Sequence, residues 1–369
     1  MTEWIKCTLD KLGEIVGGAT PSTKCEDYYG GSIPWITPKD LSSFKVRYIT
    51  SGERNITEKG LASCSAQMMP KDAVLFTSRA PIGYVAIASQ SVCTNQGFKS
   101  IVVNEKADPL FVYYLLKYNK DAIEAMGSGT TFKEVSGKTM RAVKVRIPLD
   151  VSYQKRIAAV LDSLDTKIEN NERINDNLEL QAQAIYSYMF IENADPAWVQ
   201  GHLSDLITVK YGKDHKKLAD GSYPVYGSGG IMRYVERPLY DKESVLIPRK
   251  GTLNNVMYVN QPFWSVDTMF YTEMRLPNVA KFVYHFVKAK DLASMNAGSA
   301  VPSMTTDILN AMEVVIPSTS ALAEFESLVD PMYRAMQENN IQSSKLSELR
   351  DALLPKLMSG EIDVSDIQL

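Results

Sequence analysis

The sequence predicts an α+β protein in which one unit, a mixed α/β domain followed by a long helix, occurs twice. Three observations support this: two long segments with a heptad pattern, an internal repeat that extends beyond them, and short strand-like runs in each half. The chain has 369 residues, enough for two or three domains with separate cores. A hydrophobic content of 45% and a charged content of 22% are typical of a globular protein.

The first long helix is predicted between Gln154 and Met189, where residues at alternating steps of four and three form one face. No Pro or Gly interrupts the segment, and residues of high helix propensity predominate. At about 1.5 Å per residue the helix is roughly 50 Å long, enough to hold two bodies apart. The positions on this face are Ile157, Leu161, Leu164, Ile168, Asn171, Asn175, Leu178, Ala182, Ile185 and Met189.

The same pattern returns near the C-terminus at an offset of 168 residues, and Asn339 and Ser343 then correspond to Asn171 and Asn175. Because a polar residue on a contact face has a partner only in the correct register, we expect the two helices to pack on each other. In the alternative, each helix covers only its own domain. Pro331 removes a backbone donor and is expected to kink or delay the second helix. The positions of the second face are Phe325, Val329, Met332, Met336, Asn339, Ser343, Leu346, Arg350, Leu353 and Leu357.

The helices are the ends of two longer repeats. Asp72–Leu75 matches Glu243–Leu246 and Phe111–Tyr114 matches Phe282–His285, both at an offset of 171, whereas Leu9 and Leu12 match Leu203 and Leu206 at 194. The difference between these offsets places about 23 extra residues between Gly13 and Asp72 of the first half. In that half we expect strands over 73–77, 84–88, 99–103 and 140–147 and a helix over 109–120. The second half repeats this scheme over 245–247, 256–259, 279–288 and 311–316.

Composition excludes several classes of protein. The N-terminus has no apolar signal region and no run approaches 18 apolar residues, so secretion and membrane insertion are not expected. The four cysteines all lie in the first quarter without a CxxC spacing, which indicates reduced thiols in a cytoplasmic protein. The three histidines are far apart in sequence, so no zinc site is expected.

No catalytic set stands out. Gly137-Lys138-Thr139 resembles the end of a phosphate-binding loop, but Phe132 occupies the position of its first Gly and a strand is expected to follow. The chain has no Pro-Pro pair, so it lacks the Asn/Asp-Pro-Pro-aromatic element of methyltransferases that act on exocyclic amines, and it lacks the usual nuclease motif. We therefore predict a chain that is not itself an enzyme.

The net charge of −3 and the pI near 5.8 argue against a free-standing, non-specific DNA-binding protein. Even so, loops in both halves are rich in side chains able to hydrogen-bond base edges, since Arg and Lys match guanine and Asn and Gln match adenine. For any single residue, a solvated polar loop is the alternative. The DNA-binding candidates are Lys39, Ser78, Arg79, Asn95, Gln96, Thr130, Thr131, Lys133, Lys138, Lys213, Lys216, Lys217, Arg249, Lys250, Asn254 and Asn255.

Several segments, in order along the chain, resemble the specificity (S) subunits of type I restriction–modification systems. In the first half these are Gly17–Ser22, Tyr29–Leu41, Ala80–Gly83, Asn95–Phe98 and Gly129–Phe132. In the second half they are Tyr223–Ile231, Asp267–Thr268 and Leu353–Ile362.

The resemblance implies two target-recognition domains related by pseudo-two-fold symmetry and joined by two long antiparallel coiled-coil helices. Each domain would read one half of a bipartite target on double-stranded DNA, and the helices would set the gap and dock two methylation (M) subunits. Restriction (R) subunits would then join, and no membrane would be involved. S-adenosylmethionine, ATP and Mg are expected in those partner subunits, with no cofactor in this chain. Because the two domains differ in length and in their loops, an asymmetric target is expected.

The resemblance also implies domain boundaries. The first recognition domain is expected over residues 1–150, the first helix over 151–191, the second domain over 192–318, the second helix over 319–360 and a tail over 361–369.

Two other functions remain open: a DNA-modifying enzyme with an unfamiliar site, and a coiled-coil scaffold with paired protein- or sugar-binding domains. Methyl transfer or cleavage by the chain alone would favour the first. Sequence-specific DNA retention together with a methylation subunit would exclude the second.

Overall fold

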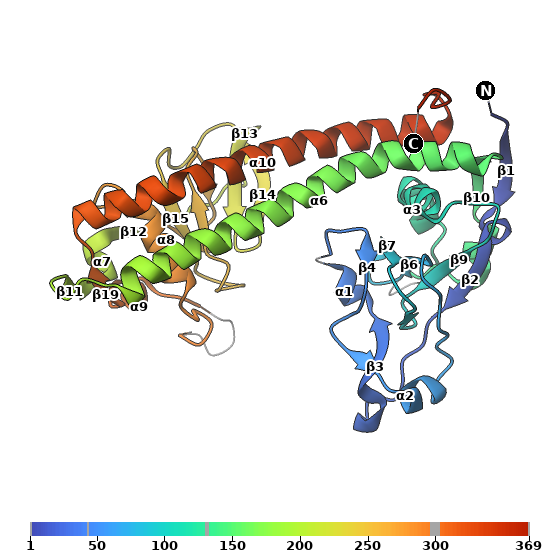
Figure 1. Cartoon of the computed structure of the whole chain (residues 1–369), viewed down its shortest axis with the longest axis horizontal. Coiled ribbons are helices and arrows are strands. Elements are labelled where there is room, and N and C mark those ends of the chain that lie inside the picture. Colours follow the sequence, from blue (N-terminus) through green and yellow to red (C-terminus); the bar gives the residue numbers. More distant parts are fainter. Residues whose placement is uncertain (1, 43, 130–132, 296–302, 368–369) are drawn as a thin grey trace. The chain divides into compact units, whose positions relative to one another are not determined.

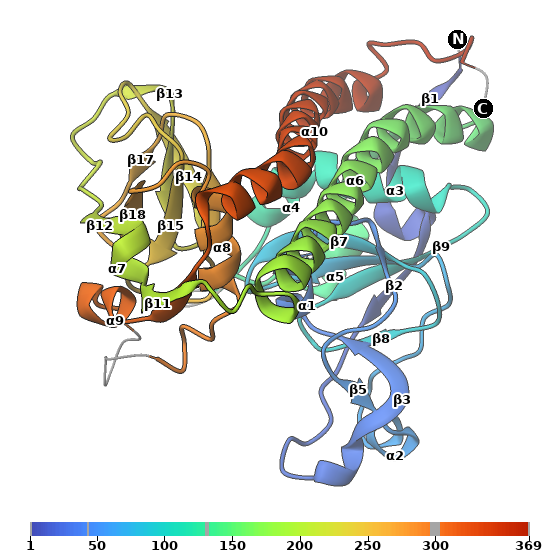
Figure 2. The ribbon, with the colours of Figure 1, turned by 60° about the vertical axis from the view of Figure 1, so that its left-hand side comes forward.

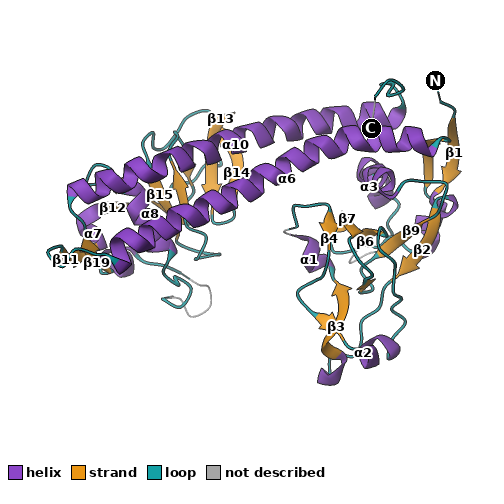
Figure 3. Cartoon of the chain, in the orientation of Figure 1, coloured by secondary structure: helices purple, strands orange, loops and turns teal. Residues whose placement is uncertain are grey.

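A computed structural model describes residues 2–42, 44–129, 133–295 and 303–367. The chain forms two compact units: unit 1 contains Met1–Glu172 and Asn340–Leu369, and unit 2 contains Arg173–Asn339. Two long helices, α6 (Val151–Ser187) and α10 (Thr319–Ser359), each contribute residues to both units. Figure 1 shows the chain coloured along its sequence, and Figure 3 distinguishes helices from strands.

In the described part of unit 1, a five-stranded sheet has the order β2-β9-β6-β7-β4, a smaller sheet has the order β5-β3-β8, and β1 pairs with β10. The strands are β1 (Trp4–Thr8), β2 (Gly13–Gly17), β3 (Tyr29–Ile36), β4 (Tyr48–Ile49), β5 (Asn55–Ile56), β6 (Val74–Ser78), β7 (Ile82–Ala88), β8 (Cys93–Thr94), β9 (Lys99–Val103) and β10 (Lys144–Pro148). The helices are α1 (Pro38–Ser42), α2 (Glu58–Ala62), α3 (Pro109–Tyr118), α4 (Lys120–Ala125) and α5 (Gly137–Ala142), with 3-10 turns η1 (Leu9–Lys11) and η2 (Glu26–Tyr28).

Unit 2 repeats this plan over its described residues, with sheets of order β12-β18-β15-β16 and β14-β13-β17 and a β11-β19 pair. The strands are β11 (Val199–His202), β12 (Ile207–Tyr211), β13 (Asp220–Gly227), β14 (Gly230–Val235), β15 (Ser244–Pro248), β16 (Met257–Val259), β17 (Trp264–Ser265), β18 (Met269–Met274) and β19 (Glu313–Ile316). The helices are α7 (Leu203–Leu206), α8 (Ala280–Lys288) and α9 (Thr306–Asn310), and a π-helical turn η3 (Tyr188–Glu192) follows α6.

The two units have the same strand connections apart from one insertion. Strand β4 extends the main sheet of unit 1 by pairing in parallel with β7, and the main sheet of unit 2 has no equivalent strand among its described residues. Strand β4, together with α1 and α2, lies between Gly13 and Asp72, where the sequence places the extra residues. Strands β3 and β5 and helix α2 lie at the end of unit 1 away from α6 (Figure 2).

The core of each unit explains the predicted domain helices. Asp108 accepts a hydrogen bond from the Phe111 backbone N–H at 2.9 Å, and Pro109 occupies the first helical turn, so both features start α3. Phe111 and Tyr114 are then fully buried, and Phe282 and His285 occupy the equivalent positions of α8. The mixed α/β architecture predicted from the sequence is confirmed.

The expected strand over 140–147 is wrong in its first part. Ser136 caps a short helix by accepting a hydrogen bond from the Thr139 backbone N–H at 3.0 Å, and α5 runs to Ala142 before β10 begins at Lys144. Burial of Met140 within this helical turn overrides the strand-like alternation that follows it. A helix does therefore begin at Gly137, but the sequence still has Phe132 in place of the first glycine of a phosphate-binding loop.

Helices α6 and α10 run antiparallel within each unit. In unit 1, Asn171 donates to Ser343 Oγ at 3.1 Å and Asp165 pairs with Arg350 at 2.7 Å, so later positions of α6 meet earlier positions of α10. In unit 2, Asn339 donates to Asn175 Oδ1 at 2.9 Å. Ile157 and Phe325 are fully buried, and all other heptad positions of the two helices are at least half-buried.

Pro331 neither delays nor ends the second helix, since α10 begins at Thr319 and continues to Ser359. A proline removes its own N–H donor and its ring crowds the carbonyl four residues earlier. The apolar positions on both sides of it, Val329 and Tyr333, are nevertheless buried. Packing of these two side chains therefore keeps the segment helical through the proline.

Candidate nucleic-acid interface

Each unit presents a loop cluster at the same edge of its main sheet. In unit 1, the Ser78 backbone N–H donates to the Gly97 carbonyl at 2.7 Å, and the Val135 N–H donates to the Ser78 carbonyl at 3.0 Å. In unit 2, Arg249 makes the corresponding bonds, to Thr268 at 2.9 Å and from Met304 at 2.9 Å. Equivalent backbone hydrogen bonds therefore connect loops that are distant in sequence in both units.

Close backbone approach supports both clusters. A Cβ on Gly18 would lie 2.0 Å from the Asn95 carbonyl oxygen, and a Cβ on Gly212 would lie 2.0 Å from the Val266 carbonyl oxygen. The indole N–H groups of Trp35 and Trp264 donate to the carbonyls of Ala19 and Lys213, which are also equivalent in the repeat. Because glycine has no side chain at these crossings, the two strands can meet and hold the loops on one surface.

In unit 1 the cluster contains charged side chains that the sequence did not single out. Glu134 lies 3.4 Å from Arg79 and 3.5 Å from Lys99, so one carboxylate orients two cations. Gln96 is exposed and accepts a hydrogen bond from Thr20. A guanidinium held by a carboxylate at the surface loses less conformational freedom when it binds a base.

The structure argues against two of the candidates in this unit. Ser78 is fully buried and its hydroxyl donates to the Gly97 carbonyl at 3.1 Å, so it cannot contact DNA in this conformation. Asn95 is half-buried, and its Oδ1 accepts from the Gly97 N–H at 2.8 Å, which occupies the oxygen needed to recognise adenine. Both residues shape the loop, and a polar residue in a turn gives no sequence signal that separates this role from DNA contact.

In unit 2, Arg249 is the most completely oriented candidate. Its guanidinium lies 5.3 Å from the centre of the Tyr211 ring, and Nη1 donates to the Asp267 carbonyl at 3.3 Å. The Tyr211 ring is 52% exposed, so the arginine rests on an aromatic surface that is open to solvent. Tyr211 was not among the candidates because an aromatic residue more often belongs to the core.

The asparagines of unit 2 connect this loop to its neighbours. Asn255 donates to the Ser228 carbonyl at 2.8 Å, at the tip of the β13–β14 hairpin. Asn254 is exposed, but it donates to Asp291 at 3.1 Å and accepts from the Ala293 N–H at 2.9 Å. Asn255 is therefore placed to hold the hairpin against the loop, and Asn254 would have to exchange partners to bind a base.

The remaining candidates are scattered over the two units. Lys39 on α1 pairs with Glu53 at 2.7 Å, both side chains being largely exposed. Thr130 and Thr131 lie outside the described residues. The other candidates, all of them exposed, are Lys133, Lys138, Lys213, Lys216, Lys217 and Lys250.

Comparison with known proteins identifies a family to which this chain is similar. The model of the "Type I restriction modification DNA specificity domain" matches residues 1–180 and 197–339. The chain belongs to this family. It is 31% identical to the MjaIX specificity subunit of Methanocaldococcus jannaschii, over 99% of this chain and 95% of that subunit. It is 22% identical to the EcoprrI specificity subunit of Escherichia coli, over 89% of this chain and 86% of that subunit.

The fold is shared as well. The crystal structure of a type I restriction–modification S subunit from M. genitalium matches 96% of both chains with a TM-score of 0.60 and 20% identity. In the described ranges of this specificity-family chain, His, Cys, Asp and Glu side chains form no group of three that could hold a metal ion. None of its described helices is both long and apolar enough to cross a membrane.

In unit 1 a buried arginine connects the specificity domain to α6. Arg47 lies in the insertion, with its side chain 6% exposed. It pairs with Asp162 at 3.0 Å and with Glu169 at 3.3 Å, and it donates to Thr166 Oγ1 at 2.8 Å. Nearby, Tyr114 of α3 donates to Asp165 of α6 at 2.8 Å.

Unit 2 has an equivalent connection made of different residues. Lys281 of α8 is 2% exposed and pairs with Glu326, with Asp330 at 3.2 Å and with Glu243 at 3.6 Å. Burial alone would lower the pKa of Lys281, but the hydrogen bond to Glu326 and the neighbouring carboxylates raise it. Asp330 corresponds to Asp162 in the repeat, so both units attach a buried cation to the same helix position.

The hydrogen bond between Tyr114 and Asp165 has a counterpart in unit 2. His285 Nε2 lies 2.9 Å from Tyr333 Oη, and these residues correspond to Tyr114 and Asp165. Burial lowers the pKa of His285 to about 4, so the imidazole is neutral near pH 7. In unit 1 these contacts join the specificity domain to α6, and in unit 2 Lys281 and His285 join it to α10.

Proposed function

We propose that this chain is the sequence-reading subunit of a type I restriction–modification system, with each unit reading one half of a two-part target on double-stranded DNA. The observation behind this proposal is the pair of loop clusters with the same backbone frame and different side chains. Ser78 and Arg79 correspond to Arg249 and Lys250, and Gln96 corresponds to Asp267. Because base recognition depends on donor and acceptor patterns, the two clusters would select different half-sites.

Of the candidates, Arg79 and Arg249 have the geometry best suited to bases. Each guanidinium is oriented by a neighbouring group, Glu134 or Tyr211, and each stands at the surface of its cluster. A forked guanidinium recognises guanine through two acceptors of the major groove. The exposed lysines around them would contact phosphates and fix the position of the protein on the duplex.

The partners we propose are two methylation subunits, joined later by restriction subunits. Helices α6 and α10 keep apolar side chains on their outer faces: Leu180 is 69% exposed, Leu328 47% and Leu349 48%. Such side chains are suited to a protein interface. The methylation subunits would bring S-adenosylmethionine, and the restriction subunits would bring ATP and Mg. These partners would also supply phosphate contacts that a chain of net charge −3 lacks.

The helices would set the number of base pairs between the half-sites. The Asn171–Ser343 and Asn175–Asn339 contacts each need one register of the two helices, and a shift would leave polar groups facing apolar ones. A single register would give a single gap. Two modules reading the same face of DNA are about one helical turn, roughly 34–36 Å, apart.

Methylome sequencing tests this function directly. Cells lacking other methyltransferases would express the chain together with its methylation partner. We expect methylation at one interrupted motif with two unlike halves and a constant gap. Omitting this chain while keeping the methylation subunit is the control and should abolish that motif. Methylation at a continuous motif, or at none, would refute the proposal.

A further inference from the structure

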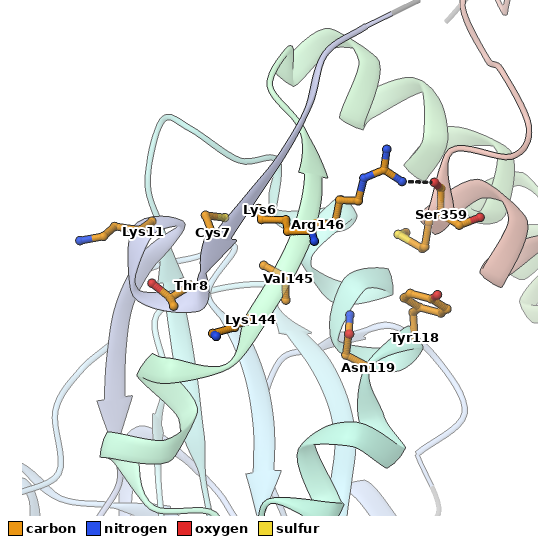
Figure 4. A pocket seen from close by; sticks show the side chains of 11 residues that line it. Lys6, Cys7, Thr8, Lys11, Tyr118, Asn119, Lys144, Val145, Arg146 and Ser359 are labelled. Carbon is orange, nitrogen blue, oxygen red and sulfur yellow. Dashed lines mark hydrogen bonds between the residues drawn. The ribbon is translucent and has the colours of Figure 1, made fainter.

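Unit 1 contains a groove of about 840 Å³ beside the β1–β10 pair (Figure 4). We call it groove 1. Its walls come from β1, β10, the C-terminal end of α3 and the last turn of α10. Arg146 of β10 donates to the Ser359 carbonyl at 2.8 Å, which closes one side of the groove.

Unit 2 contains a smaller groove of about 250 Å³, which we call groove 2, beside the β11–β19 pair. It occupies the same place in the repeat. Tyr118 and Asn119 of groove 1 correspond at the offset of 171 to Ala289 and Lys290 of groove 2. The segment 144–146 corresponds at 169 to 313–315, and Met358 and Ser359 correspond at 168 to Phe190 and Ile191. Lys6 corresponds at 194 to Gln200.

Groove 1 combines an apolar surface with a strong positive charge. Cys7, Val145 and Met358 contribute apolar surface, and burial raises the pKa of the Cys7 thiol, so that this side chain is neutral. No Asp or Glu is among its lining residues, all of which the structure describes, although Asp10 lies outside it, 3.9 Å from Lys11. The cationic residues that line groove 1, all exposed, are Lys6, Lys11, Lys144 and Arg146.

Groove 2 has a similar apolar surface but no net positive charge. Ile191 is 62% exposed and Val315 36% exposed at its edge, and Phe282 and Phe286 of α8 form part of its wall. Its cation, Lys290, lies over the Phe286 ring at 4.6 Å, and Glu313 is a second charge of opposite sign. What the two grooves share is therefore a hollow able to accept an apolar side chain.

We propose that the two grooves bind the same segment of the methylation subunit, one copy in each groove, through an apolar side chain of that segment. Acidic residues beside that side chain contact Lys6, Lys144 and Arg146 in groove 1, whereas binding in groove 2 depends on apolar contact alone. This inference rests on the proposed function, in which two copies of one partner assemble with this chain.

Charge and shape favour a protein segment over duplex DNA. Phosphates are bound by charged and polar groups and do not need an apolar hollow. Groove 2, with Glu313 at its wall and Ile191 at its edge, would not attract a phosphate backbone. Interfaces between proteins combine a buried apolar centre with charged residues at the rim, as groove 1 does. Since the grooves are equivalent parts of one repeat, a single kind of partner fits both.

The test uses the full chain with its methylation partner, and native mass spectrometry counts the copies bound at low and at high salt. In Lys6→Glu/Lys144→Glu, we expect one of the two copies to bind on the order of tenfold more weakly at low salt, with little salt dependence remaining. In Ile191→Glu, we expect the other copy to weaken by a similar factor, while the salt-dependent copy is unaffected. Lys59→Glu/Lys71→Glu, which changes two exposed lysines of unit 1 outside the groove, is the matched control.

The outcomes separate this inference from the proposed function. No binding of the methylation subunit to the wild-type chain would contradict the proposed function. Two copies bound equally by all variants and by wild type would refute the groove inference alone. Unchanged assembly with uniformly weaker DNA binding in Lys6→Glu/Lys144→Glu would identify groove 1 as a phosphate contact and also refute it. Thermal unfolding of each variant shows that it is folded, and two copies of equal salt dependence on the wild-type chain would refute the inference without any variant.

Discussion

Arg47 fastens the first recognition domain to α6, and replacing it with alanine is expected to destabilise unit 1 by about 3–5 kcal/mol. The Arg47 side chain is 6% exposed, and its guanidinium lies 3.0 Å from Asp162 and 3.3 Å from Glu169. The Glu169 side chain is 10% exposed. Removing the cation leaves the Glu169 carboxylate buried without its ionic partner, and the desolvation of that charge is then not compensated. The Arg47 backbone N–H still donates to Glu169 at 3.0 Å, which places the loss toward the lower end of this range.

The assay is urea unfolding of the full chain, followed by hydrogen exchange of the α6 segment 162–169 and of β4. The control is Lys39→Ala, which removes a pair of similar length with side chains 77% and 64% exposed and is expected to cost at most about 1 kcal/mol. Adding Glu169→Gln to the Arg47→Ala variant should recover part of the loss, because the buried charge is then gone. If Arg47→Ala costs no more than Lys39→Ala, the reasoning about a buried connection is refuted.

Three further predictions concern unit 2 and the helices. The pKa of His285 in the folded chain, about 4, lies below the usual value near 6.5, so the free energy of unfolding present above pH 6.5 should fall by about 3 kcal/mol as the pH drops to 4. His285→Gln should lose this pH dependence in urea unfolding. If the variant and the wild-type chain depend equally on pH, His285 is not the group responsible. Arg249→Ala should cost about 1–3 kcal/mol of DNA binding and relax one base position, while a uniform loss on all sequences would make Arg249 a phosphate contact. Inserting seven residues after 172 in α6 and seven after 339 in α10 should lengthen the gap in the methylated motif and leave both half-sites unchanged; altered half-sites would contradict the ruler role of the helices.

Much of the fold follows from local patterns. The heptad positions of α6 and α10 and the offsets between the halves are properties of residue order, and regular secondary structure places residues of the right spacing on one face wherever the helix lies. The polar pairs Asn171–Ser343 and Asn175–Asn339 belong to the same pattern. The pairing of β1 with β10 in unit 1 was less accessible from the sequence, because it joins residues more than 130 positions apart.

The candidate site was only partly predictable. Ser78 and Arg249 occupy equivalent backbone positions, yet one side chain is buried and the other rests on Tyr211 at the surface. Turn residues have the same composition whether they bind DNA or hold a loop together, so the sequence alone cannot separate the two roles. Arg47 was missed for a related reason: an arginine in a polar insertion looks solvated until the fold places it against Asp162 and Glu169.

The sequence by itself determined that one unit occurs twice, that each copy ends in a long helix, and that the chain resembles DNA-specificity proteins. Periodicity, repetition and motif order are properties of residue order, so they can be read before the chain folds. Only the tertiary structure decided which polar side chains are buried, which cations connect the domains to the helices, and which segments form the two equivalent grooves. The physical reason is that burial and ion pairing depend on contacts between residues far apart in sequence, and these exist only after the chain has folded.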